Sequence, residues 1–169
     1  MNLSKIKFKV AEFHEFGETV KAANYLFKKF KIDTTYLKGF EFRENAKPEF
    51  ILMTTEGNFG ELQSIRIPKN TFQYPLNLML CMLCHEMVHV TQKSIAPFVL
   101  DKNEREWQAY YEMLFRKIYP NIPEISNFHK KFFASKAFEY YDRMGENSEL
   151  QKKYAHQKIE VASFIKLLE

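Results

Sequence analysis

The sequence contains no long uninterrupted run of apolar residues. Its most apolar stretch, residues 76–90, is broken by Asn77, His85, Glu86 and His89, whereas a membrane-spanning helix needs about 18 or more largely apolar residues in succession. Residues 1–9 alternate charged and apolar side chains and lack the apolar segment of a signal peptide. We therefore expect a cytoplasmic protein with no membrane partner.

Cysteine is also scarce. Cys81 and Cys84 are the only two, which is too few for the disulfide framework of a small secreted domain. Together with His85 they form a CxxCH sequence, which attaches c-type haem, but such attachment ordinarily requires export. We expect both thiols to pack as small apolar side chains instead.

Neither sign of charge dominates the sequence. The 25 Lys and Arg residues and the 21 Asp and Glu residues leave a net charge of +4, and the lysines are scattered along the chain. Scattered lysines favour an ordinary solvated surface over a dedicated nucleic-acid interface, although nucleic acid stays open as a partner.

The length and composition fit one globular domain. A chain of 169 residues, of which 46% are hydrophobic and 27% charged, has enough apolar material for one core. No internal repeat or low-complexity linker divides it. We therefore expect a single domain over residues 1–169.

Hydrophobic periodicity predicts an α+β fold. Apolar residues three or four apart indicate an amphipathic helix from Val10 to Phe30. Segments rich in aromatic and β-branched residues then predict a small antiparallel sheet, whose third strand is of the edge type because it ends in proline. The three predicted strands are Tyr36–Phe42, Phe50–Thr55 and Leu62–Pro68. The predicted helices after the sheet are Leu76–Ser94, Lys102–Tyr119, Ser126–Arg143 and Ser148–Leu168.

The first helix after the sheet carries the motif with the clearest chemistry. Residues 85–89 read His-Glu-Met-Val-His, an HExxH sequence. Because residues four apart lie on the same helix face, His85 and His89 can offer two imidazoles to one Zn²⁺. Glu86 lies at the edge of that face, where it can take a proton from metal-bound water. The apolar residues around the motif predict a core helix, in which these polar side chains need partners. A metal supplies such partners; the alternative is a core helix whose histidines bond to nearby hydroxyls or carboxylates.

A catalytic zinc site needs a third protein ligand. The downstream candidates are Asp101, Glu104, Glu106, Glu112, His129 and His156. Asp101 and Glu104 have the spacing of a capping box, which would occupy Glu104 at the helix start. Glu106 shares an apolar helix face with Ala109 and Met113, where a bare carboxylate is out of place. We therefore favour Glu106 over Glu104 as the third ligand of one zinc ion per chain.

This pattern resembles the gluzincin metallopeptidases, in which HExxH is followed by a glutamate ligand within an E-x-x-A/S-D motif. Glu106 and Ala109 match that motif, whereas Tyr110 stands where the family has an aspartate that orients a ligand histidine. That role could pass to Glu104, to a backbone carbonyl, or to nothing.

The sequence around the motif, residues 71–75 and 84–90, also resembles SprT-like proteases. Those proteases use a third histidine and often carry a four-cysteine zinc ribbon. Residues 103–107 contain no histidine, and two cysteines cannot form the ribbon.

Both resemblances imply a sheet edge strand beside the zinc that binds an extended polypeptide substrate, and Leu62–Ile67 would be that strand. An oxyanion stabiliser is also expected, because the tetrahedral intermediate develops negative charge. Its candidates are Tyr110, Tyr111 and His129.

The sequence therefore predicts a zinc-dependent metallopeptidase with Glu86 as general base and His85, His89 and Glu106 as metal ligands. Two alternatives stay open. One is a SprT-like protease that acts on DNA-associated proteins; the other is a catalytically inactive zincin-fold protein used for binding.

Overall fold

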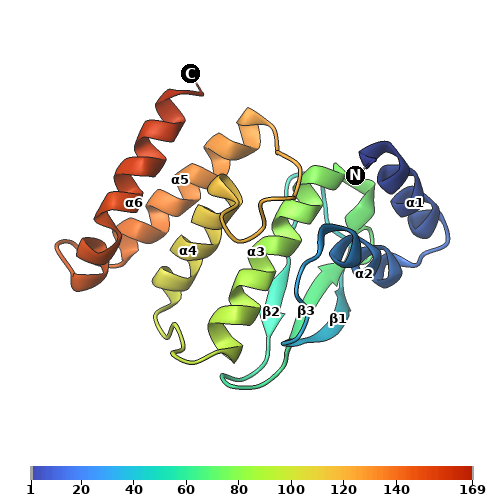
Figure 1. The fold of residues 1–169 in the computed structure, drawn as a ribbon, viewed down its shortest axis with the longest axis horizontal. Helices are drawn as coiled ribbons and strands as arrows, with labels where there is room; N and C mark the ends of the chain where they lie inside the picture. Colours follow the sequence, from blue (N-terminus) through green and yellow to red (C-terminus); the bar gives the residue numbers. More distant parts are fainter. Residues whose placement is uncertain (1, 169) are drawn as a thin grey trace.

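The computed structural model describes residues 2–168, so both ends of the expected domain, Met1 and Glu169, lie outside the described residues. It has the α+β organisation that the sequence predicts (Figure 1). Two N-terminal helices precede a three-stranded sheet, and four longer helices follow it. Helix α3 packs against the sheet, α4 packs against α3, and α5 and α6 follow on the far side of α4 (Figure 1).

The prediction of one N-terminal helix from Val10 to Phe30 is wrong, because the chain breaks into two helices. Helix α1 spans Leu3–Glu15 and helix α2 spans Thr19–Phe30. Gly17 between them has φ +70°, a left-handed conformation that ends helices and that glycine adopts at little cost. Phe16, which the periodicity placed on the apolar face, is 75% exposed at this break.

The sheet is mixed rather than antiparallel. Its strands are β1 (Leu37–Arg43), β2 (Thr54–Glu56) and β3 (Gln63–Pro68), in the order β1-β3-β2. Strand β3 pairs parallel with β1 and antiparallel with β2. The prediction of β3 as an edge strand is therefore wrong; it is the central strand, and Ile65 and Ile67 on it are fully buried. Pro68 is the last residue of this strand.

Helix α3 spans Leu76–Ser94, as predicted, and is buried along most of its length. Both cysteines lie within it, and burial raises the pKa of the Cys81 thiol to about 12 and that of Cys84 well above its ordinary value. Protonated, buried thiols are poor metal ligands and poor nucleophiles. The two cysteines therefore pack as small apolar side chains, in line with the prediction.

The other three helices agree with the predicted ones to within a few residues: α4 spans Lys102–Phe115, α5 spans Asn127–Arg143 and α6 spans Glu149–Lys166. Helix α4 ends four residues before the predicted Tyr119, because Arg116 has the left-handed φ of +50°. Trp107 on α4 is fully buried where α4, α5 and α6 meet, with its ring against Tyr141 and Tyr154. These contacts fix α4 and therefore the position of Glu106.

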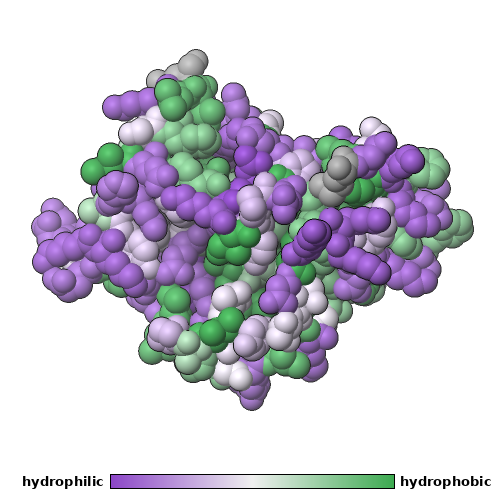
Figure 2. Space-filling view, in the orientation of Figure 1, coloured by the Kyte–Doolittle hydropathy of each residue, from purple (hydrophilic) through white to green (hydrophobic). Residues whose placement is uncertain are grey.

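None of the helices between residues 2 and 168 combines the length and the apolar character that crossing a membrane requires. In the face drawn in Figure 2, hydrophilic side chains are spread over the surface and separate the apolar patches.

Candidate metal centre

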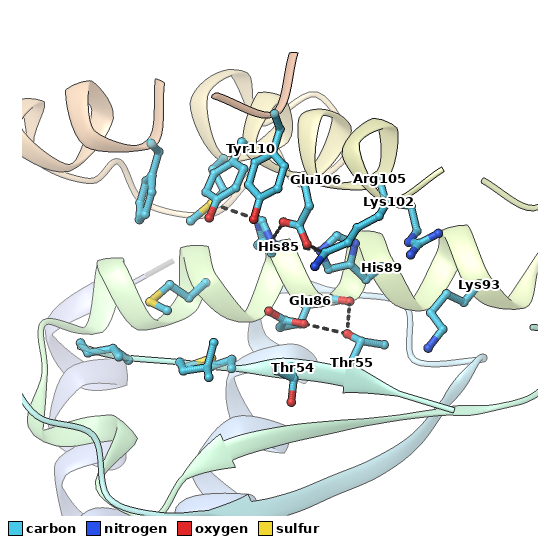
Figure 3. Close-up of a pocket in the computed structure, with 17 residues that line it drawn as sticks. Thr54, Thr55, His85, Glu86, His89, Lys93, Lys102, Arg105, Glu106 and Tyr110 are labelled. Atoms are coloured by element: carbon cyan, nitrogen blue, oxygen red, sulfur yellow. Dashed lines mark hydrogen bonds and ion pairs between the residues drawn. The ribbon is translucent and has the colours of Figure 1, made fainter. Parts of the chain in front are cut away.

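Two neighbouring helices bring three metal-ligand side chains to one point. His85 and His89 lie one turn apart on α3, and Glu106 faces them from α4 (Figure 3). One ligand atom from each lies within 4.8 Å of the other two. Ala109 on α4 is fully buried and adds almost no bulk, which favours a close approach of the two helices. This group could hold a metal ion.

The atoms that could bind a metal are the Nε2 atoms of the two histidines and the carboxylate oxygens of Glu106, and they lie close together. The Nε2 atoms of His85 and His89 are 3.1 Å apart. The Glu106 carboxylate has one oxygen 3.5 Å from His85 Nε2 and the other 3.6 Å from His89 Nε2. Two imidazoles and one carboxylate are a donor set that suits a divalent metal ion.

The charges of the cluster depend on one another. Burial alone would raise the pKa of the Glu106 carboxyl, but hydrogen bonds and charge from His85 and His89 outweigh it and hold that pKa well below its ordinary value. Burial alone would lower the pKa of His89, but Glu106 and Glu86 raise it. A proton on His89 and a metal ion therefore compete for the same atoms, so metal binding is expected to release protons.

A hydrogen bond fixes the orientation of His89. Its Nδ1 lies 2.7 Å from Oε1 of Gln92. The Gln92 amide cannot turn round, because its Nε2 donates to the Arg105 carbonyl (3.1 Å) and to Oε1 of Gln108 (2.8 Å). Gln92 Oε1 is therefore the acceptor, His89 Nδ1 carries the proton, and the lone pair of Nε2 points at His85 and Glu106. This arrangement fits a cation bound between the three side chains.

The same hydrogen bonds continue from α4 to α6. Gln108 Nε2 donates to the Tyr154 hydroxyl (2.5 Å), which donates to Oε1 of Glu104 (2.6 Å). Lys153 also donates to that oxygen, at 2.7 Å. We call the series His89–Gln92–Gln108–Tyr154–Glu104 the glutamine relay. It ends on a carboxylate, so hydrogen bonds connect His89 to the negative charge of Glu104.

The structure separates the two glutamates that compete for the role of third ligand. Glu106 lies with the histidines, whereas the Glu104 carboxylate turns toward α6. Asp101 does cap α4 by accepting from the Glu104 backbone N–H at 2.8 Å. The capping box is nevertheless incomplete, because the Glu104 side chain bonds to Tyr154 and Lys153 rather than reaching back to Asp101. The Lys153 ammonium and the Tyr154 hydroxyl both bond to this carboxylate and hold it away from the helix start.

Glu86 lies beside the cluster on the edge of the same helix face (Figure 3). The Thr55 hydroxyl lies 2.8 Å from Glu86 Oε2 and 3.0 Å from the Glu86 carbonyl oxygen. Thr55 is on β2, so the strand holds the carboxylate at a defined position. Glu86 is only 6% exposed, yet it lines the cavity in front of the cluster.

That cavity, which we call the cleft, has a volume of about 450 Å³. One wall is residues 51–55, which lead into and form part of β2; the others come from α3, α4 and α5. Tyr110 also lines it, with its ring 4.7 Å from the His85 ring and stacked on Tyr140. Burial, and then the charge of Glu106, raise the pKa of Tyr110 well above its ordinary value, so its hydroxyl is a hydrogen-bond donor at neutral pH.

The remaining sequence candidates have other partners. The Tyr111 hydroxyl bonds to Glu160 and Lys117, away from the cleft. His129 bonds to Ser126 at the start of α5. Glu112 accepts from the backbone of Ile118 and Tyr119 and holds the loop after α4. His156 is exposed on α6. None of these four residues lines the cleft.

Comparison with models of protein families, with curated proteins and with solved structures found no match for this chain.

Proposed function

We propose that this protein is a zinc-dependent metallopeptidase. The observation that carries the proposal is the position of Glu86 beside the His85, His89 and Glu106 cluster, at the edge of an open cleft. A structural metal site is normally closed by four protein ligands, whereas three ligands beside a cleft leave room for water and substrate.

The residues of the chain have separate tasks in this proposal. Zinc, when bound, would polarise the scissile carbonyl and lower the pKa of the attacking water. Glu86, held by Thr55, accepts the proton from that water and passes it to the leaving amine. Tyr110 is the favoured oxyanion donor, because it is the one residue of the three candidates that lines the cleft.

The substrate strand has to be reassigned. Leu62–Ile67 cannot offer a free edge, because β3 pairs with β1 on one side and β2 on the other. Strand β2 is one of the two edge strands of the sheet, and residues 51–55 form a wall of the cleft. We therefore expect the backbone of this segment to hold an extended polypeptide by hydrogen bonds.

A proteolysis assay tests the proposal. We expect the zinc-loaded protein to cut an unfolded polypeptide such as casein, to lose this activity with a zinc chelator, and to regain it when zinc is restored. Full zinc occupancy without cleavage would contradict the proposal and favour the inactive zincin-fold alternative. Cleavage that appears only when DNA is added, and is abolished by salt, would favour the SprT-like alternative.

A second prediction concerns the effect of the glutamine relay on zinc affinity. Gln92→Ala removes the acceptor that orients His89 and should weaken zinc binding by about 10–100-fold. Tyr154→Phe, which removes one hydroxyl farther along the relay, should weaken it less. Gln73→Ala, an exposed glutamine of the short η1 helix (Thr71–Gln73), is the control. Competition titration with a zinc-binding dye measures all three; equal zinc affinities in Gln92→Ala and wild type would exclude an orienting role for the relay.

A further inference from the structure

The two ends of the cleft differ in chemistry. Lys93 near the end of α3 and Arg105 in the first turn of α4 lie on the side of His89 away from Tyr110, and Lys102, at the start of α4, extends from that side toward His89 (Figure 3). The apolar and aromatic lining residues include Ile51, Leu52, Met82, Met113, Phe133 and Tyr140. A substrate that crosses the cluster therefore meets three cationic groups at one end of the cleft, which we call the cationic end.

None of these three positive charges forms an ion pair with a carboxylate in the part of the chain that the structure describes. Glu56 attracts Lys93, but its carboxylate already pairs with Arg66 at 3.3 Å. The acidic groups within the cleft, Glu86 and Glu106, bond to Thr55 and to the two histidines. The cationic end is therefore not neutralised by the protein itself.

Arg105 is held in place without losing its charge. Its guanidinium donates to the carbonyls of Val99 and Leu100, at 2.9 and 2.8 Å, and lies over the Phe59 ring. Carbonyl oxygens satisfy some of its five N–H donors but supply no negative charge. Arg105 therefore keeps its positive charge beside Lys93. Burial, and then this charge, lower the pKa of Lys93.

We propose that the cationic end binds a carboxylate of the substrate, so that this peptidase prefers peptides with an acidic side chain, or a free C-terminal carboxylate, on one side of the scissile bond. The inference rests on the proposed function. Charge-assisted hydrogen bonds from Lys and Arg are about twice as strong as neutral ones, and the partial burial of Lys93 and Arg105 weakens the screening of their charges by salt. The apolar lining residues would take the hydrophobic side chains of the same peptide.

Matched peptides test the inference. One internally quenched peptide series carries Glu or Gln at each position flanking the scissile bond, and a second ends in a free carboxylate or an amide. We expect the peptide with the carboxylate to be cut with about 10–100-fold higher kcat/KM than its neutral counterpart. This difference should appear only when the carboxylate is on the side of the scissile bond that lies at the cationic end. The first series isolates an acidic side chain and the second a C-terminal carboxylate as the group that is bound.

Charge-removing variants locate the effect. Lys93→Gln combined with Lys102→Gln should reduce the ratio of kcat/KM between acidic and neutral peptides toward one. Lys152→Gln removes a charge from the exposed surface of α6 and should leave this ratio unchanged. Arg105 is kept, because it also holds the loop that contains Val99 and Leu100.

A binding measurement separates this inference from the proposed function. Fluorescence anisotropy with the zinc-loaded protein should show tighter binding of the acidic peptide than of its amide counterpart, and added salt should reduce the difference. No cleavage of any peptide, together with this binding preference, would overturn the peptidase proposal but support the carboxylate site. Cleavage or binding that is equal for acidic and neutral peptides would overturn the carboxylate site.

Discussion

Glu86→Gln is expected to lower kcat/KM for peptide cleavage by about 10²–10⁴-fold while the protein keeps its zinc. Glutamine has the shape of glutamate and can keep the contact with Thr55, but it cannot accept a proton from water at neutral pH. The proposed zinc ligands are untouched, because Glu86 is outside the group formed by His85, His89 and Glu106. Activity and zinc content of the same preparation are the two measurements.

The control for this variant is Glu146→Gln, the same change at an exposed position between α5 and α6. It should retain the activity and the zinc of the wild type. If Glu86→Gln cut peptides as fast as Glu146→Gln, Glu86 would not be the general base. If Glu86→Gln lost zinc together with activity, the loss of activity could not be assigned to proton transfer. The assignment of Glu86 to proton transfer and of His85, His89 and Glu106 to metal binding would then be wrong.

Glu106→Gln should have the largest effect on the metal. It exchanges the only carboxylate of the cluster for a neutral amide, which removes the negative charge that faces both histidines. We expect zinc affinity to fall by more than the roughly 10–100-fold typical of losing an outer-shell partner. Zinc should accordingly no longer raise the melting temperature of this variant, although at 100-fold excess over Kd it adds about 2.7 kcal/mol to a protein that binds it.

Glu104→Gln is the matched comparison, since it makes the same change two residues away on the same helix. Its carboxylate bonds to Tyr154 and Lys153 at the end of the glutamine relay and does not contact the cluster. We expect zinc affinity to fall by no more than the outer-shell range. A larger loss in Glu104→Gln than in Glu106→Gln would reverse the assignment of the third ligand.

Local sequence patterns predict which three side chains lie together, and the structure places them where one ion could bind all three. The spacing of His85 and His89 needs only a helix to place both rings on one face. Glu106 was identified because its neighbours at Ala109 and Met113 define an inward face, and the structure places it against both histidines. These inferences depend on helical geometry, which relates residues only a few positions apart and can therefore be predicted from the sequence.

Features that depend on distant parts of the chain were not predictable in the same way. The order β1-β3-β2 depends on contacts between strands that are far apart in the sequence. The alternation of apolar and polar residues within Leu62–Pro68 therefore indicates neither the parallel pairing of β3 nor its central position. The glutamine relay likewise joins Gln92 to Tyr154. Gln92 carried a signal, since it lies three residues after His89, but nothing local indicated Tyr154.

The helix break at Gly17 is a local feature that hydrophobic periodicity alone does not predict. The apolar spacing continues from Phe13 through Phe16 to Val20, so periodicity alone joins the two helices. The structure ends α1 at Glu15 and starts α2 at Thr19, with Gly17 left-handed between them. A glycine at this position favours helix termination, and in the structure this preference outweighs the continuous periodicity.

The zinc content of the purified wild-type chain tests the central claim most directly. The protein would be incubated with excess zinc, desalted, and measured by elemental analysis beside Glu106→Gln. The account predicts about one zinc per wild-type chain and almost none in the variant. A folded wild-type protein that retains no zinc would contradict the metal centre, and with it both the proposed hydrolysis and the role assigned to Glu86.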